Sequence, residues 1–187
     1  LEANAPRHPH PSTDVYQPSY VGRLVHADIV GPFKRSIVGH YQYALVLVDD
    51  HSRYKSVHFL KRKSDALSKT RDFVKQLNSH LNRGRAEPVK IVGSLHTDNA
   101  GEFLSREFKE FLSEESVTQT TCPPHVHSLN GVAERAIRSI IENARSHMVA
   151  SACPTSFWPF AVQHAVEVLN RVTGPPNSSV SSFELLQ

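Results

Sequence analysis

Hydrophobic and polar positions over the first half of the chain predict four β-strands. Residues 22–33, "GRLVHADIVGPF", are mostly apolar and end at a Gly-Pro pair, which is typical of a strand stopped by a turn. Residues 43–50, "YALVLVDD", begin with an unbroken apolar run, which indicates a strand buried on both faces. Residues 54–60, "YKSVHFL", alternate like the second strand of a hairpin, and residues 89–98, "VKIVGSLHTD", predict a further strand.

The spacing of apolar residues also predicts four helices. Ser64–Leu81 carries them at helical intervals, and Ser64 suits the N-cap position. Ser105–Glu115 repeats the pattern over a shorter segment, and residues 117–121, "VTQTT", predict a brief strand after it. A long helix is predicted from Gly131 to Ser151, and a last one from Pro154 to Val172, where Pro154 suits the first turn.

The order of these elements is three strands, a helix, a strand, a helix, a short strand and two helices. This order predicts an α/β fold with a five-stranded mixed sheet flanked by helices, in which the first three strands meander and the later ones cross over. The length of 187 residues, 39% of them hydrophobic, suits one domain of ordinary size. The start of the chain is rich in Pro, His and Ala, so we expect a linker at residues 1–20 and the folded domain at 21–187.

Composition narrows the class of protein. No apolar run approaches the roughly 18 residues of a membrane span, and no charged, apolar leader indicates secretion. Two cysteines, Cys122 and Cys153, are too few for a disulfide framework, which favours a reducing, intracellular setting. The net charge of +3 and the pI near 9.0 indicate an anionic partner. However, residues 1–97 carry +7 and residues 98–187 carry −4, which is not the pattern of a simple basic nucleic-acid binder.

Three carboxylates stand out against this background. Asp28 lies inside an apolar strand, where charged residues are rare, and Asp98 lies at the carboxyl end of a strand, where open α/β sheets bind ligands. Glu134 lies in the first turn of the long helix, and 35 residues separate it from Asp98. At about 100° per residue, Glu134 falls on the border between the apolar stripe of that helix and its arginine side.

Each acid also has a plainer interpretation. Asp28 suits an ion pair with a neighbouring Arg or Lys, and Asp98 suits an Asx-type turn. Glu134 complements the positive end of the helix dipole, which is compatible with binding a cation. If the three acids converge, they repel one another, and Mg²⁺ or Mn²⁺ would offset that repulsion because hard cations prefer oxygen ligands. Two such ions about 3.5–4 Å apart can activate a nucleophile and stabilise a leaving oxygen at a phosphorus atom.

Four segments in order, "HADIVGP", "YALVLVDDHSRYKSVHFLKRKSDA", "HTDNAGEF" and "NGVAER", resemble the catalytic core of copia-type LTR-retrotransposon integrases, in the retroviral integrase superfamily. The resemblance runs from about Gly22 to Gln187. It implies an RNase H-like fold in which Asp28, Asp98 and Glu134 form the catalytic, metal-binding D,D-35-E triad. It also implies two Mg²⁺ or Mn²⁺ ions per active site when DNA is bound.

The activity that this resemblance implies is a polynucleotidyl transfer. The enzyme joins the 3′-OH ends of retrotransposon cDNA to target DNA by in-line transesterification, without a covalent enzyme intermediate. The resemblance implies that residues 1–20 follow an N-terminal zinc-binding domain, and that the core works with that domain and a basic C-terminal one. We therefore expect weak integration by this chain alone. We also expect at least a dimer of cores, no membrane contact, assembly in cytoplasmic virus-like particles and action in the nucleus.

Further residues are candidates for contacts with DNA. They lie after the second acid, in the loop "CPPHVHSLN" or along the long helix: Asn99, His125, His127, Asn130, Gly131, Arg138 and Arg145. The two loop histidines also suggest zinc, but no Cys or His at ligand spacing supports that interpretation. The cluster at residues 61–63 is either solvated or in contact with DNA. Glu102 suits a surface acid, and the alternatives are a brace for the site or a contact with DNA.

Other interpretations remain open at this stage. Asp49 and Asp50 are predicted to be turn residues between two strands. Trp158, with Phe157 and Phe160, is predicted to belong to the core or to a subunit interface rather than to a base-stacking platform. Two other functions fit the same fold: an RNase H-like nuclease, and a domesticated or architectural DNA-binding domain without catalysis.

Overall fold

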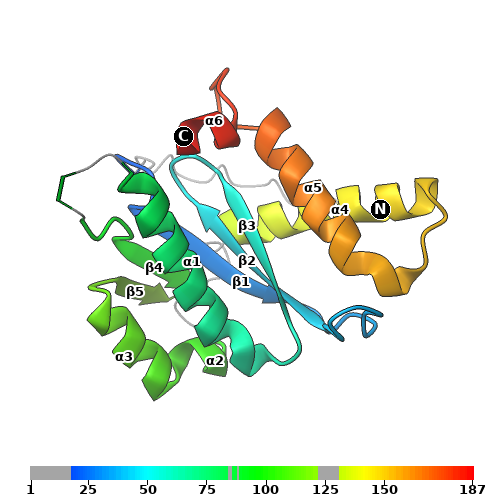
Figure 1. Cartoon of the computed structure of the whole chain (residues 1–187), viewed down its shortest axis with the longest axis horizontal. Coiled ribbons are helices and arrows are strands. Elements are labelled where there is room, and N and C mark those ends of the chain that lie inside the picture. Colours follow the sequence, from blue (N-terminus) through cyan, green and yellow to red (C-terminus); the bar gives the residue numbers. More distant parts are fainter. Residues whose placement is uncertain (1–17, 84–85, 88, 122–130) are drawn as a thin grey trace, which may run out of the picture.

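One mixed sheet and helices on both of its faces make up the protein (Figure 1). The computed structural model describes residues 18–83, 86–87, 89–121 and 131–187. Its strands are β1 (Leu24–Val30), β2 (Tyr43–Asp49), β3 (Lys55–Leu60), β4 (Ser94–Thr97) and β5 (Thr118–Thr121). Its helices are η1 (Lys63–Asp65), α1 (Ala66–Leu81), α2 (Gly101–Leu104), α3 (Arg106–Glu114), α4 (Gly131–Ala150), η3 (Thr155–Phe157), α5 (Trp158–Val172) and α6 (Ser182–Leu186), of which η1 and η3 are 3₁₀ helices.

The strand order in the sheet is β3-β2-β1-β4-β5. β1, β2 and β3 are antiparallel neighbours, whereas β4 lies parallel to β1 and β5 lies parallel to β4. The predicted mixed sheet, with a meander followed by crossovers, is therefore confirmed. Because β1, β4 and β5 run in the same direction, their carboxyl ends lie at the same edge of the sheet.

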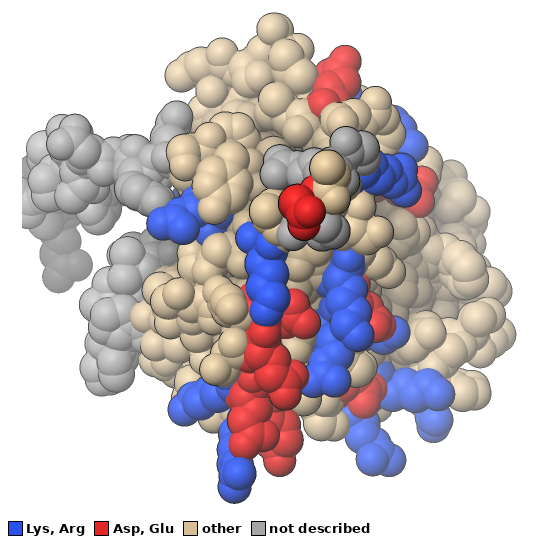
Figure 2. All heavy atoms as spheres, turned by 60° about the vertical axis from the view of Figure 1, so that its left-hand side comes forward, with Lys and Arg blue, Asp and Glu red and all other residues tan. Residues whose placement is uncertain are grey.

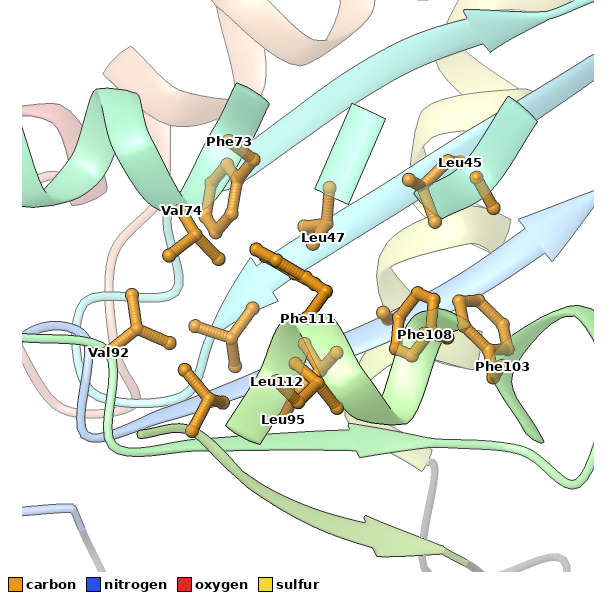
Figure 3. Packing of buried hydrophobic residues seen from close by; sticks show 14 of the residues in the cluster. Leu45, Leu47, Phe73, Val74, Val92, Leu95, Phe103, Phe108, Phe111 and Leu112 are labelled. Atoms are coloured by element: carbon orange, nitrogen blue, oxygen red, sulfur yellow. The ribbon is translucent and has the colours of Figure 1, made fainter. Parts of the chain in front are cut away.

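Strand β2 contributes to the core on both faces of the sheet. Leu45 and Leu47 belong to a core that also contains side chains of α1, α2 and α3 (Figure 3). Ala44, Val46 and Val48 belong to a second core with α4 and α5. All five side chains are at most 1% exposed, so the prediction of a strand buried on both faces is confirmed.

The register of β1 against β2 determines which face of the sheet the polar side chains of β1 point to. Directly paired residues on neighbouring strands point to the same face of a sheet. Asp28 is paired with Val46, and His26 is paired with Val48. Both β1 side chains therefore point to the face that α4 and α5 cover.

Two predicted helix starts are wrong by a few residues because a short 3₁₀ helix, η1 or η3, precedes each α-helix. Ser64 lies inside η1, and the carboxylate of Asp65 accepts two backbone N–H groups of the preceding turn at 3.0 Å each. Pro154 precedes η3, and Pro159 occupies the first turn of α5 instead.

The helix predicted at residues 105–115 is preceded by an additional short helix, α2, that periodicity did not indicate. Ser105 separates the two, since its backbone is extended and its hydroxyl accepts the N–H of Phe108 at 3.3 Å as the N-cap of α3. Among the described helices, none combines the length and the apolar character that crossing a bilayer would require.

Candidate active site

Asp28 lies in β1, the middle strand of the sheet, and its side chain is partly buried. Its Oδ1 accepts the backbone N–H of Ile29 at 2.7 Å. Within the described residues, no Lys, Arg or His side chain lies within ion-pair distance of this carboxylate. The interpretation of Asp28 as one half of a structural ion pair therefore has no support here.

Asp98 directly follows β4, the parallel neighbour of β1. Thr97 is paired with Ala27, so the next residue on each strand brings Asp98 beside Asp28. Asp98 Oδ1 accepts the N–H of Ala100 at 3.1 Å, which is the Asx-type turn expected from the sequence. A carboxylate has two oxygens, so capping this turn is compatible with binding a cation.

Glu134 is the fourth residue of α4, and its side chain is exposed. The predicted apolar stripe of this helix is confirmed in outline, since Ala133, Ile140 and Ala144 are buried. Ile140 and Ala144 pack in the core with Val46 and Val48 of β2, and so hold α4 over the face of the sheet to which Asp28 points. Glu134 thus lies exposed in the first turn of α4, while the buried side of the helix packs against the strands.

The electrostatics of Asp28 link the three acids. The pKa of this carboxyl is raised to about 6, chiefly because burial disfavours the charged form. The N–H of Ile29 opposes this rise, the negative charges of Asp98 and Glu134 both add to it, and the ammonium of Lys63 opposes it. Asp28 therefore lies within electrostatic range of both other acids, although the three are remote in sequence.

The three acids do not converge on one point. In the described part of the chain, no group of three or more His, Cys, Asp or Glu side chains is arranged to hold a metal ion. The donor set still fits a hard divalent cation, because it consists of carboxylate oxygens whose mutual repulsion such an ion would offset. Of the three acids, Asp28 and Asp98 are partly buried and Glu134 is exposed.

A lysine that acts on Asp28 is itself paired with a glutamate. The ammonium of Lys63 lies 3.4 Å from Glu102 Oε1, and the same ammonium lowers the pKa of Asp28. Glu102 Oε1 is buried and has no well-directed hydrogen bond, so the ion pair is its compensation. Glu102 is thus partly buried and paired with Lys63, rather than a fully solvated surface acid. Lys63 itself is exposed, like the other two residues of the basic cluster 61–63.

A sequence profile described as "Integrase core domain" matches residues 18–127, more than half of the chain. Asp28 and Asp98 both lie inside the matched residues, and Glu134 lies beyond them. The chain belongs to the integrase core domain family. The resemblance noted from the four sequence segments is therefore confirmed at the level of the family.

Curated relatives of this integrase core include polyproteins of plant transposons. One is the retrovirus-related Pol polyprotein from transposon TNT 1-94 of Nicotiana tabacum, 34% identical over 82% of this chain and 11% of the polyprotein. Another is the corresponding polyprotein from transposon RE2 of Arabidopsis thaliana, 31% identical over 80% of this chain and 10% of the polyprotein. The chain thus spans about a tenth of the length of these relatives.

Solved structures confirm the RNase H-like fold of the integrase core. The catalytic core domain of HTLV-2 integrase, in complex with magnesium and in a dimeric form, matches with a TM-score of 0.65 and 20% identity over 91% of this chain and 100% of that one. The simian T-cell lymphotropic virus intasome, in complex with a PP2A regulatory subunit, matches with a TM-score of 0.74 and 19% identity over 98% of this chain and 61% of that one.

The predicted DNA contacts of the integrase core are only partly described. Asn99 is exposed beside Asp98, and Gly131 is the first residue of α4. Arg138 and Arg145 are exposed on the same helix. Three further candidates lie outside the described residues: His125, His127 and Asn130. Most of the predicted linker at residues 1–20 also lies outside them.

The face of the integrase core that carries α1 and α3 mixes charges of both signs (Figure 2). The acidic side chains of α3 are exposed there at Glu107, Glu110 and Glu114. Arg106 forms an ion pair with Glu110 at 2.7 Å, and Lys69 of α1 forms one with Asp72 at 3.3 Å. Such a face does not present the continuous positive potential that a DNA backbone requires.

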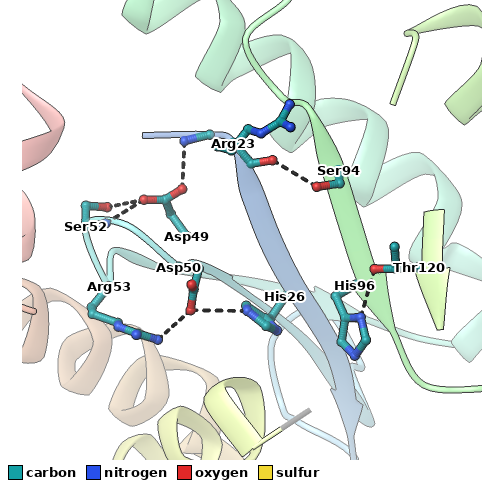
Figure 4. A network of polar contacts seen from close by, with 10 residues as sticks. Arg23, His26, Asp49, Asp50, Ser52, Arg53, Ser94, His96 and Thr120 are labelled. Carbon is teal, nitrogen blue, oxygen red and sulfur yellow. Dashed lines mark hydrogen bonds and ion pairs between the residues drawn. The ribbon is translucent and has the colours of Figure 1, made fainter. Parts of the chain in front are cut away.

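The two acids at the β2–β3 turn are buried parts of a polar network, which the sequence did not indicate (Figure 4). Asp49 accepts the backbone N–H of Gly22 and both the N–H and the hydroxyl of Ser52, each at 2.7 Å. Asp50 contacts His26 at 3.3 Å and Arg53 at 2.7 Å. Burial alone would raise the pKa of Asp50, but the contacts with these two residues outweigh it and lower the pKa. The predicted turn is confirmed for Asp50, whereas Asp49 is the last residue of β2, and the contact of Asp50 with His26 fixes the turn to β1.

Trp158 lies in the hydrophobic core, which is one of the two places predicted for it. Its side chain is 6% exposed and its ring packs against Phe33 and Phe59. The indole N–H donates to the carbonyl of Lys34 at 2.8 Å, which ties the β1–β2 connection to α5. Phe160 is 56% exposed on the same helix.

Proposed function

We propose that this chain is the catalytic core of a copia-type retrotransposon integrase, a polynucleotidyl transferase that joins 3′-OH ends of element cDNA to target DNA. The observation that carries the proposal is the pairing of β1 with β4, which brings Asp98 beside the partly buried Asp28. The negative charges of Asp98 and Glu134 also add to the rise that burial causes in the pKa of Asp28. Asp98 directly follows β4 and Glu134 lies in α4, so both acids act on Asp28 although they are remote from it in sequence. Membership of the integrase core domain family and the transposon relatives support the same activity.

In the proposed site, the three carboxylates hold Mg²⁺ or Mn²⁺, two ions per site when DNA is bound. The ions supply activation of the attacking oxygen and stabilisation of the leaving oxygen at a phosphodiester. Asp28 and Asp98 contribute rigid positions, because β1 and β4 are paired neighbours within the sheet. Glu134 contributes an adjustable one, because it is exposed on the first turn of α4. Asp28 must give up its proton to act as a ligand, and Lys63 favours that loss.

A DNA-binding domain on the same fold without catalysis is the second candidate. The spacing of the acids favours it, since no three of the described His, Cys, Asp and Glu side chains converge as a metal site. A measurement of metal-ion binding distinguishes the two functions, because a DNA-binding domain without catalysis does not require the three acids to bind a metal ion. An RNase H-like nuclease is a third possibility, and its product would be cut DNA or RNA rather than joined DNA.

Strand transfer by the chain itself tests the proposal. We expect Mg²⁺- or Mn²⁺-dependent joining of a labelled duplex with a free 3′-OH to a target duplex, and a loss of at least about 100-fold in Glu134→Gln. Glu142→Gln is the matched control, because Glu142 is exposed on the same helix two turns further on. Circular dichroism would verify that both variants fold.

Calorimetric titration with Mn²⁺ gives a second readout that does not depend on activity. The wild type and Glu142→Gln would bind Mn²⁺ alike, and Glu134→Gln would bind it at least about tenfold more weakly. Equal Mn²⁺ binding by all three proteins, or joining that survives in Glu134→Gln, would refute the assignment. Cleavage without joining would favour the nuclease.

We further propose that the core works as at least a dimer, because joining two cDNA ends to one target requires two active sites. Assembly in cytoplasmic virus-like particles and action in the nucleus follow from the same function. Sedimentation of the chain with and without DNA checks the first expectation. Fractionation of cells that express the whole element checks the second.

A further inference from the structure

A groove of about 300 Å³ lies between the N-terminal half of α4, the β2–β3 turn and the chain that follows α5. Three of its lining side chains are basic: Arg53 on the turn, Lys55 at the start of β3 and Arg135 on α4. The other lining residues are neutral, so no described Asp or Glu lines the groove. Three elements remote in sequence thus bring three positive charges to one place.

Lys55 is the most unusual of the three. The residue is 8% exposed, and its ammonium donates only to neutral oxygens, the carbonyl of Arg53 at 3.0 Å and the hydroxyl of Thr173 at 3.3 Å. Within the described residues, no carboxylate lies within ion-pair distance of it. Burial, helped by the charge of Arg53, lowers the pKa of Lys55 to about 8, so the side chain is still mostly charged at pH 7. A buried charge without a counter-charge destabilises the folded state.

The neighbouring cations leave the groove positive. Arg53 is partly neutralised, because its guanidinium lies 2.7 Å from Asp50. Arg135 is exposed and forms no ion pair with any described residue. Among the described residues, the carboxylate of Asp50 is therefore the one ion-pair partner of the three cations. An anion bound in the groove would supply further negative charge.

The groove lies on a different side of α4 from the three acids. Successive residues of a helix are rotated by about 100°, so Glu134 and Arg135 project in different directions. Ser139, which also lines the groove, is about 140° away from Glu134, whereas Arg138 is only about 40° away from it. A ligand in the groove would leave the side of Glu134 accessible.

We propose that this groove, formed by Arg53, Lys55 and Arg135, is a binding site for a phosphate group. Lys55 and the neutral hydroxyl of Thr173 form its buried base, and Arg135 forms its outer wall. Guanidinium and ammonium groups together are the usual partners of phosphate oxygens. The phosphate is either free in solution or part of a nucleic-acid backbone. Only the second source rests on the function proposed above.

Binding of inorganic phosphate tests the site directly. NMR or calorimetric titration at constant ionic strength would give a saturable isotherm for phosphate but not for chloride. We expect Arg135→Gln to weaken phosphate binding about tenfold, because it removes one charge-assisted contact. Arg83→Gln is the matched control, since Arg83 is exposed, follows the C-terminal end of α1 and does not line the groove.

Lys55→Met is a second variant, which keeps an unbranched side chain and removes the buried charge. We expect it to fold and to lose phosphate binding. Phosphate would also raise the pKa of Lys55 in the wild type, which NMR of the labelled lysine side chain would detect. No saturable binding of phosphate, or equal weakening by Arg135→Gln and Arg83→Gln, would overturn the proposal.

A duplex DNA arm identifies the source of the phosphate. If it is a backbone phosphate, inorganic phosphate competes with DNA, and Arg135→Gln reduces the salt dependence of DNA binding by about one ion. If it is free phosphate, Arg135→Gln leaves DNA affinity unchanged. Glu134→Gln retains phosphate binding in both cases, so failure of the phosphate site and failure of the proposed catalytic function give different results.

Discussion

Replacing Asp28 by Asn should stabilise the protein at neutral pH when divalent metal is absent. The carboxylate is partly buried and lies in the negative field of Asp98 and Glu134. Asn has nearly the same shape and can accept the N–H of Ile29 that Asp28 accepts at 2.7 Å. The substitution therefore removes an unfavourable charge and retains the favourable hydrogen bond.

The size of the effect follows from the pKa of Asp28, which is about 6 in the folded protein against an ordinary 3.8. Between these values the folded state holds more protons than the unfolded state, so stability falls as pH rises from about 3.8 to about 6. Above that window the ionised carboxylate costs about 2–3 kcal/mol. Asp28→Asn should recover this amount at pH 7.5 and about 1 kcal/mol at pH 4.5.

Thermal denaturation in EDTA, followed by circular dichroism at both pH values, measures this difference. For a chain of this size the gain at pH 7.5 corresponds to an increase in Tm of about 4–12 °C. Asp72→Asn is the control, because Asp72 is exposed and its surface ion pair with Lys69 contributes little. A loss of stability in Asp28→Asn at pH 7.5, or an equal gain at both pH values, would refute the reasoning. Added Mg²⁺ should stabilise the wild type and not the variant.

Two further predictions concern the contact between α5 and β3. Lys55 has a lowered pKa of about 8, so wild-type stability should rise by roughly 2–3 kcal/mol from pH 8 to pH 10.5 relative to Lys55→Met; parallel curves in urea denaturation would contradict this. Asn170 accepts the backbone N–H of Lys55 at 2.9 Å and donates to its carbonyl at 2.8 Å, both buried. Asn170→Leu leaves both groups unpaired and should cost about 2–5 kcal/mol in the same assay, whereas a cost below about 1 kcal/mol would show that these bonds matter little.

Element types were predictable from the sequence because they depend on local periodicity. The apolar run of β2 and the stripe of α4 were both assigned correctly for this reason. Helix starts were less predictable, because several residues compete for one cap. Ser64 is a good N-cap residue by type, yet it lies inside η1, where the carboxylate of Asp65 accepts the N–H groups of Lys61 and Arg62.

The proposed triad was recognisable in the sequence because a charge inside an apolar strand is rare and because four segments resembled a known family. The polar contacts around the triad and at the β2–β3 turn could not be predicted from the sequence. The ion pair of Lys63 with Glu102 joins residues 39 positions apart, and the buried network around Asp50 depends on the register of β1 against β2. Neither register nor side-chain direction follows from local sequence, because both are set by packing across the sheet.

Helix α4 connects the two sites proposed for this protein. Its buried side chains, among them Ile140, pack with Val46 and Val48 of β2 and so fix its rotation about its own axis. That rotation places Glu134 within electrostatic range of Asp28 and Arg135 in the groove beside Lys55. Substitutions in this packing would disturb both sites together, since one rigid helix carries a residue of each. Changes at Glu134 and Arg135 themselves address the two sites separately, because neighbouring residues of a helix face different sides.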